Sequence, residues 1–217
     1  MDLIKSLERR YSTKAFDPNK KISDEDQKTI ENLLQLSPSS TNVQPWHFTI
    51  ATSDQGKERI AKAAEGFYIF NKQKVLDASA VVVFSAKTEI TDDHLYKVLD
   101  KEAEDGRYAD PQFRKDYHNA RKIFVDMHKY DYKDLQHWAE KQVYLNLGNF
   151  LLGLAQMKID ALPMEGLDMK LLDQELGLRE KGFSSSIVVA LGYADESDFN
   201  KDLPKSRLSK ADIISNI

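Results

Sequence analysis

The pattern of apolar and polar positions in the first 40 residues predicts two helices. The first runs from Asp2 to about Arg9 and carries one apolar face, made of Leu3, Ile4 and Leu7. The second begins at Ser23, which can cap it with Asp26 three residues on. Its apolar side is expected to bury Ile30, Leu33 and Leu34.

Three later segments have the patterns of β-strands. Residues 47–52 alternate large and small side chains, whereas residues 81–84 and 187–191 are continuous apolar runs rich in β-branched side chains. Such runs are typical of central strands that are covered on both faces. One predicted helix separates the first two strands and at least three precede the last, so a regular βαβ repeat is excluded. We therefore expect an α+β fold with a small mixed β-sheet flanked by helices.

Two long helices are predicted between the second and third strands. One begins at Asp110 and Pro111, and its apolar stripe consists of Phe113, Tyr117, Ala120, Phe124 and Met127. The other runs from about residue 134 to residue 157, and its stripe contains two amides, Gln142 and Asn149. Buried amides need hydrogen-bond partners, so this stripe predicts polar contacts. Its uncharged stretch is shorter than the ~18 residues that suggest a membrane span.

Length, charge and cysteine content limit the class of protein. The 217 residues fit one domain, residues 1–217, and we find no linker, repeat or low-complexity tract. A composition of 41% hydrophobic and 30% charged residues excludes disorder, and a net charge of −4 argues against nonspecific nucleic-acid binding. Without cysteine the chain has no disulfide, thiolate metal site or cysteine nucleophile. The first residues lack the apolar region of a signal peptide, so we expect a cytoplasmic protein without a membrane partner.

The familiar cofactor and catalytic motifs are missing from the sequence. Two glycine pairs have the spacing of a phosphate loop, but neither is followed by the required Lys-Ser or Lys-Thr. No pair has the G-x-G spacing of a Rossmann fingerprint. The five histidines form neither an i, i+4 pair nor an HExxH motif, so no metal site is expected. Residues 184–186 are serines, but they lack the G-x-S-x-G pattern of a nucleophile elbow.

Two rows of basic and hydroxyl side chains remain as candidates for binding. Arg10, Ser12 and Lys14 alternate, so an extended backbone would direct them to the same side. Residues 205–207, Lys-Ser-Arg, form a similar row. Guanidinium groups and hydroxyls match the oxygens of a phosphate monoester, and the two rows could converge on one phosphate. Each row alone is explained as well by solvated surface charge.

Two loops are also unusually polar or permissive. Residues 37–46 are dense in hydrogen-bonding groups and lie between a helix and a strand, although an ordinary capped loop has the same composition. Residues 163–166 lead into a further helix, and Gly166 would allow the backbone to approach a flat ligand closely.

Taken together, these segments resemble the oxygen-insensitive NAD(P)H nitroreductases, a group that includes enzymes described as dihydropteridine reductases. The resemblance covers essentially the whole chain. It is carried by PSSTNVQPW (residues 38–46), RYSTK (10–14), Phe70-Asn71, Gly148-Asn149-Phe150, Glu165-Gly166 and LPKSR (203–207). It implies an FMN flavoprotein with a nitroreductase-like fold, assembled as an interlocked homodimer with the flavins at the subunit interface.

The resemblance also implies a role for individual residues. The phosphate of FMN would be bound by Arg10, Lys205 and Arg207 with help from Ser12, and Tyr11 would act mainly through its backbone. The pyrimidine end of the ring would meet Lys14, Asn71 and Lys74. The backbone near flavin N5 and O4 would come from Pro163, Glu165 and Gly166, and Gln142 would lie close to the cofactor. The other subunit would contribute Pro38, Ser39, Ser40 and Asn42.

Substrates would meet Thr41 and Phe124 by the same resemblance, whereas periodicity alone places Phe124 in a helical core stripe. The implied reaction is a ping-pong transfer of hydride from NADH or NADPH through FMN to a nitroaromatic, quinone, pteridine or flavin. No side chain need act as an acid or base, because the flavin carries the redox chemistry. Two alternatives are a dedicated flavin reductase and a noncatalytic flavin-binding protein.

Overall fold

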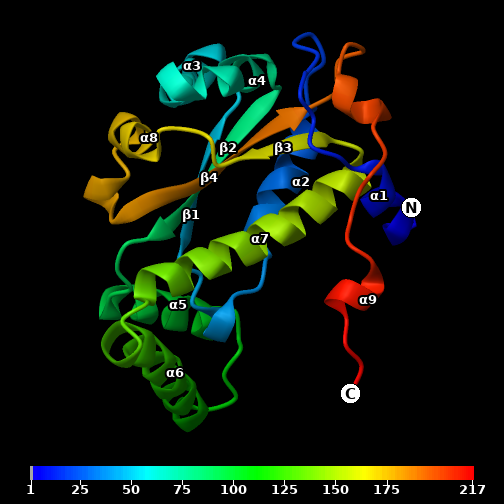
Figure 1. The fold of residues 1–217 in the computed structure, drawn as a ribbon. Helices are drawn as coiled ribbons and strands as arrows, with labels where there is room; N and C mark the ends of the chain where they lie inside the picture. The colour runs from blue at the N-terminus through cyan, green and yellow to red at the C-terminus, as the bar shows by residue number, and fades with distance from the viewer. Residues whose placement is uncertain (1) are drawn as a thin grey trace.

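The computed structural model describes residues 2–217 and shows an α+β fold built on one four-stranded sheet (Figure 1). The strand order is β1-β2-β4-β3. The strands are β1 (Trp46–Ala51), β2 (Ala80–Lys87), β3 (Asp160–Met164) and β4 (Phe183–Gly192). The helices are α1 (Leu3–Arg9), α2 (Asp24–Gln35), α3 (Asp54–Ala61), α4 (Lys72–Asp77), α5 (Asp92–Glu104), α6 (Pro111–Asp126), α7 (Leu135–Met157), α8 (Met169–Leu176) and α9 (Lys210–Ile213).

Helices cover both faces of the two central strands. Successive residues of β2 point to opposite faces, so Val81 and Val83 pack on one side while Val82 and Phe84 pack on the other. The first side is covered by α3, α4 and α8, and the second by α2 and α7 (Figure 1). The continuous apolar runs of β2 and β4 are thus the centre of a three-layer core, as the sequence predicts for doubly covered strands.

The sheet differs from the prediction in two ways. All three strand pairings are antiparallel rather than mixed. The reason is that, between two paired strands, the chain comes back to the same end of the sheet at which the first strand ended. The only parallel contact among the described residues is an isolated bridge between Ser12 and Ala161. The sequence also missed β3. This strand lies at the edge of the sheet, where Pro163 is tolerated although it cannot donate to a ladder.

The two N-terminal helices lie where the sequence places them. Asp2 and Ser23 cap α1 and α2, and Ser23 accepts a hydrogen bond from the backbone of Asp26. In α2, two of the three predicted core residues are buried and Leu33 is half-buried. The apolar face of α1 is not covered in the single chain, since its members are 40–57% exposed: Leu3, Ile4 and Leu7.

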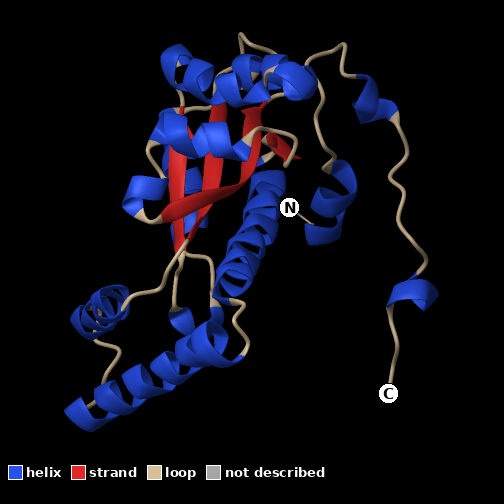
Figure 2. Cartoon of the chain, turned by 60° about the vertical axis from the view of Figure 1, so that its left-hand side comes forward, coloured by secondary structure: helices blue, strands red, loops and turns tan. Residues whose placement is uncertain are grey.

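The apolar stripe predicted for α6 is wrong. Phe113 is 47% exposed and Phe124 is 45% exposed, whereas the buried residues of α6 are Arg121 and Val125. The reason is the position of the helix. Figures 1 and 2 show α6 extending beyond the end of the sheet, so only the side that faces α5 and the loop before β1 is covered.

The register of α7 also differs from the prediction. Its core face is formed by Ala139, Val143, Leu147 and Phe150, which pack against the sheet, whereas Leu145 and Asn149 are exposed. Of the two amides in the predicted stripe, only Gln142 is buried. No helix within residues 2–217 is both long and apolar enough to cross a membrane.

The last 15 residues extend away from the body of the chain (Figures 1 and 2). Every residue of this segment is exposed. Its large apolar side chains are Leu203, Leu208, Ile213, Ile214 and Ile217.

The packing of α2 against α7 yields a stability prediction. A Cβ on Gly153 would lie 2.5 Å from Leu33 Cδ1, so Gly153→Ala should lower the free energy of unfolding by about 1–3 kcal/mol through overpacking. In a Leu33→Ala background the same change should instead stabilise by about 1 kcal/mol, because alanine is the better helix former. Urea denaturation of the four proteins in a double-mutant cycle measures both effects. Equal effects of Gly153→Ala in the two backgrounds would contradict this packing.

Candidate functional site

The two basic rows from opposite ends of the chain meet around one cavity of about 330 Å³. The N-terminal row reaches it from the end of α1, and the C-terminal row from the extended segment after residue 203. The backbone oxygen of Arg10 accepts a hydrogen bond from Lys205 Nζ, which joins the two rows directly. The predicted members that line the cavity are Arg10, Tyr11, Ser12, Lys205 and Arg207.

Three cations of this cavity lack an ion-pair partner in the described part of the chain, although Glu8 and Arg9, which pairs with Asp160, also line it. Within residues 2–217, no carboxylate forms an ion pair with Arg10, Lys205 or Arg207. Burial and the charge of Arg207 lower the pKa of Arg10, and burial and both arginines lower the pKa of Lys205. Partly desolvated cations that repel one another favour an anion between them. A phosphate monoester fits this donor set in both charge and hydrogen bonding.

A buried carboxylate that the sequence analysis missed shapes this cavity. Asp198 is 1% exposed, and its Oδ2 accepts hydrogen bonds from the Tyr11 hydroxyl and the backbone of Lys14, both 3.0 Å long. Its Oδ1 accepts one from the backbone of Asn200, whose side chain donates to the Ser12 carbonyl. Asp198 therefore holds the N-terminal row against the segment around Asn200, which leads into the C-terminal row. Nothing in the sequence distinguishes this residue from other acids in a polar segment.

The role of Tyr11 is broader than the expected backbone contact. Its ring lines the cavity, and its hydroxyl is the donor to Asp198. Burial and that hydrogen bond raise the pKa of Tyr11 well above its ordinary value. The side chain thus remains a neutral donor that helps to hold the buried carboxylate.

A second group of predicted residues lies where β3 ends. Asn71 Nδ2 donates to the Gly166 carbonyl at 2.8 Å, and Lys74 Nζ donates to Asn71 Oδ1 at 3.1 Å. Burial and the neighbouring charge of Lys14 lower the pKa of Lys74. Lys14 is therefore close to Lys74, and it is not among the residues that line the cavity of the basic rows. Of the three residues that the alternation argument groups together, Arg10 and Ser12 line this cavity, whereas Lys14 lies near Lys74.

Gly166 is closely packed against two side chains at this point. A Cβ on Gly166 would lie 3.0 Å from Asn71 Nδ2 and 3.5 Å from the ring of Phe70. The preceding residue, Glu165, accepts a hydrogen bond of 2.6 Å from the hydroxyl of Tyr144 on α7. Pro163 belongs to β3 and leads directly into this turn. The structure therefore joins Lys14, Asn71, Lys74 and the 163–166 segment in one region.

The polar loop before β1 does not join these residues within one chain. The backbone of Ser40 donates to Gln142 Oε1 at 2.8 Å, whereas Glu165 contacts Tyr144. Two residues along an α-helix correspond to about 200° around its axis, so the loop and Glu165 lie on different sides of α7. Within the chain, the loop residues Pro38, Ser39, Ser40 and Asn42 thus form a separate half of the predicted site.

Gln142 belongs to the loop side. Its carbonyl oxygen accepts from Ser40, and its amide donates to the carbonyl of Trp138 at 3.0 Å. The protein itself therefore supplies the partners that this buried amide needs.

The two residues expected near substrate differ in their surroundings. Phe124 is an exposed aromatic ring on α6. Thr41 lies in the loop, and its Oγ1 is buried without a hydrogen-bond partner within residues 2–217.

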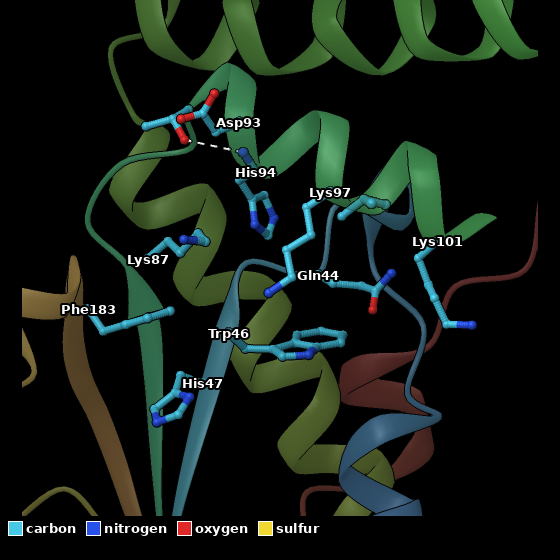
Figure 3. A pocket seen from close by; sticks show the side chains of 11 residues that line it. Gln44, Trp46, His47, Lys87, Asp93, His94, Lys97, Lys101 and Phe183 are labelled. Carbon is cyan, nitrogen blue, oxygen red and sulfur yellow. Dashed lines mark hydrogen bonds between the residues drawn. The ribbon is translucent and has the colours of Figure 1, made fainter. Parts of the chain in front are cut away.

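A larger cavity, of about 620 Å³, is lined by α5 and by residues of β1, β2 and β4, and contains none of the predicted site residues. Figure 3 shows His94 and Lys97 pointing from α5 toward Gln44 and Trp46 in its wall. The lining is mainly cationic and aromatic, and burial and the neighbouring charge of Lys97 lower the pKa of Lys87. The described residues include no cluster of three histidines or acids with the spacing of a metal site.

Comparison with known proteins identifies relatives along nearly the whole chain. Residues 7–193 match the model of the nitroreductase family. The oxygen-insensitive NAD(P)H nitroreductase of Enterobacter cloacae is 52% identical over 99% of both chains, and that of Salmonella typhimurium is 53% identical over 96% of both. The major NAD(P)H-flavin oxidoreductase of Aliivibrio fischeri is 36% identical over 98% of this chain and 97% of its own.

Solved structures share the fold at lower identity. A nitroreductase-like protein from Streptococcus mutans superposes with a TM-score of 0.80 at 22% identity, covering 99% of this chain and 97% of its own. A nitroreductase from Exiguobacterium sibiricum, solved in complex with FMN, superposes with a TM-score of 0.78 at 24% identity, covering 100% and 98%.

The cationic cavity predicts selective stabilisation by inorganic phosphate. Phosphate should raise the melting temperature of the wild type above its value in chloride of equal ionic strength. In Arg207→Ala the loss of one charge-assisted contact, about 1.5–3 kcal/mol, should abolish most of this effect. Arg59→Ala is the matched control, because it removes the same charge from a guanidinium that pairs with Glu175 and lies outside this cavity. If both variants lose the phosphate effect equally, general charge and not this donor set is responsible.

Proposed function

We propose a function on the premise that the chain belongs to the nitroreductase family. It is an FMN-dependent oxidoreductase that takes reducing equivalents from NADH or NADPH and passes them to flat aromatic acceptors. One observation of the structure carries this proposal: Arg10, Lys205 and Arg207 surround one cavity without any carboxylate partner among the described residues. Its size and charge suit the terminal phosphate of FMN.

The remaining predicted residues would bind other parts of the cofactor. Asn71 and Lys74 are held together by a hydrogen bond, and with Lys14 they present positive charge and an amide to the polar end of the ring. Glu165 and Gly166 present backbone groups at the turn after β3. FMN, when bound, supplies hydride transfer from the nicotinamide to the acceptor. The protein binds, orients and stabilises charge, and no side chain in this set is arranged as an acid-base pair.

A homodimer completes the site in this proposal. The loop of residues 38–42 lies on a different side of α7 from Glu165, so one copy cannot bring both halves together. The outward side of α7 is almost uncharged and includes the exposed Tyr144 and Leu145. A two-fold axis across this side would place the loop of one subunit beside the cationic half of the other.

Further exposed apolar surface supports an interlocked assembly. The uncovered face of α1 and the extended C-terminal segment both carry large apolar side chains. Such surface is unusual in a monomer and is typical of subunit interfaces. Because the extended segment begins at the cationic cavity, its wrapping around a second copy would couple dimer formation to cofactor binding. We place the enzyme in the cytoplasm, where NADH and NADPH are available.

The nature of the acceptor stays open between two related activities. The two relatives above 50% identity are nitroreductases, which favours nitroaromatics and quinones over other acceptors. The 36% identical relative is a flavin oxidoreductase, which keeps free flavin as a second candidate. Pteridines belong to the same flat, aromatic class. We treat all of them as substrates of one stacking slot.

Anaerobic mixing of the purified yellow protein with NADH tests the proposed function. We expect the flavin absorbance to bleach, and addition of a nitroaromatic should restore it, because donor and acceptor react in turn at one site. Initial rates should give parallel lines in double-reciprocal plots. A cofactor that resists both NADH and NADPH would identify a noncatalytic flavin-binding protein, and release of FAD in place of FMN would refute the assigned phosphate site.

The proposed interface makes a second prediction. Leu145→Lys should dissociate the dimer and release FMN, because it places a charge on the uncharged side of α7. Phe113→Lys is the matched control, since Phe113 is 47% exposed and Leu145 is 48% exposed, and α6 lies apart from α7's outward side. Sedimentation velocity over a range of concentrations distinguishes the two. A wild type that sediments as a folded, FMN-bound monomer at micromolar concentration would exclude the dimeric site.

A further inference from the structure

The loop before β1 is held at each of the six residues from Ser39 to Gln44. The backbone of Gln44 donates to Ser39 Oγ at 2.9 Å, which closes the loop on itself. The other four residues are bound by helices. Gln142 of α7 holds Ser40, Arg121 of α6 holds the Thr41 carbonyl at 2.8 Å, Glu102 of α5 holds the Asn42 amide at 2.7 Å, and His94 of α5 contacts the Val43 carbonyl at 2.7 Å.

This loop also has a strained backbone. Thr41, Asn42 and Gln44 have φ angles of 48°, 54° and 46°. Residues other than glycine rarely adopt this left-handed region, and a β-branched residue such as Thr41 is the least suited to it. Three such residues within four positions persist only where the surroundings impose them, and such strain is concentrated at functional sites.

A buried ion pair supplies the strongest of these constraints. Arg121 is fully buried and Glu102 is 3% exposed, and Arg121 Nη2 lies 2.6 Å from each carboxylate oxygen. Burial acts to raise the pKa of Glu102, but hydrogen bonds from Arg121, Asn42 and Tyr108 outweigh it and lower the pKa. The carboxylate is therefore ionised at neutral pH, and its pairing with the guanidinium is permanent.

Both members of the pair also form hydrogen bonds with the loop. Arg121 Nε donates to the Thr41 carbonyl, and Glu102 Oε1 accepts from the Asn42 side chain. A buried ion pair is a poor way to hold two helices together, because desolvation offsets most of its attraction. It is a good way to fix direction, since a guanidinium and a carboxylate each hold several partners in defined geometry.

We propose that the Arg121–Glu102 pair is a positioning element of the substrate site, which fixes Thr41 and Asn42 in the conformation that a second copy of this chain requires at its flavin. This inference rests on the proposed function, in which the loop completes the other subunit's site. It assigns the helices α5 and α6 a part in the reaction that is separate from any direct contact of Phe124 with substrate.

Two substitutions separate positioning from general stability. In Arg121→Lys the ammonium can still pair with Glu102, but it cannot also reach the Thr41 carbonyl as the guanidinium does. Tyr108→Phe is the matched control, because Tyr108 donates to Glu102 Oε2 and makes no contact with the loop. Glu102→Asp is a second test: it keeps the charge opposite Arg121 but shortens the reach to Asn42.

The FMN-loaded dimers of these variants should differ in two measurements. In Arg121→Lys, amide hydrogen exchange of residues 39–44 should become at least about tenfold faster, because the loop opens locally. The KM for a nitroaromatic acceptor should rise about fivefold or more, since a displaced loop weakens binding of the acceptor while the cofactor anchor stays in place. FMN affinity should change less than about threefold, as the phosphate contacts remain. Tyr108→Phe should retain wild-type exchange and KM even if its melting temperature falls.

The outcomes separate the two hypotheses. Wild-type exchange and KM in Arg121→Lys would overturn the positioning role, and so would an equal rise of KM in Tyr108→Phe. If Arg121→Lys does not fold, Glu102→Asp decides by the same two measurements. If the wild type fails to oxidise NADH, the proposed function fails, and hydrogen exchange of residues 39–44 still decides whether the pair holds the loop.

Discussion

Helix α7 packs Val143, Leu147 and Phe150 against the sheet while leaving Tyr144 and Leu145 uncovered on its other side. A helix with large apolar side chains on two sides must be covered on both. The sheet covers only part of this one, and the rest of the architecture follows. The polar loop and the turn after β3 attach to different sides of α7, so these two groups of residues lie apart in one chain, and in the proposed dimer a second copy brings them together.

In the cationic half of the site, hydrogen bonds hold the backbone and Tyr11 in place, whereas the charges of Arg10, Lys205 and Arg207 are not neutralised by ion pairs among the described residues. Asp198 is the buried acid at this point, and it is committed to the Tyr11 hydroxyl and the backbone of Lys14. It therefore orients the N-terminal basic row without forming an ion pair with Arg10 or Lys205. A phosphate in the cavity would relieve their mutual repulsion, and these cations are not already committed to intramolecular ion pairs within residues 2–217.

The loop half follows the opposite principle. Its backbone is strained at Thr41, Asn42 and Gln44, and three helices hold it through hydrogen bonds. Rigid positioning of neutral donors suits a stacking slot, because the flavin performs the electron transfer and discrimination among acceptors depends on shape and alignment. One half thus supplies charge for anchoring, and the other supplies geometry.

The sequence by itself determined the central strands, the capped start of α2 and the motifs that carry the family resemblance, because each depends on neighbours within a few residues. Tertiary structure decided the rest. The stripe of Phe113 and Phe124 has the correct period for a core face, but α6 projects beyond the sheet and leaves it exposed. The edge strand β3 was hidden by Pro163, which only an edge position allows. Asp198 and the Arg121–Glu102 pair look like ordinary charged residues in the sequence, and only long-range contacts bury them. Once buried, a charged side chain must be satisfied by hydrogen bonds, and those bonds fix the position of its partners.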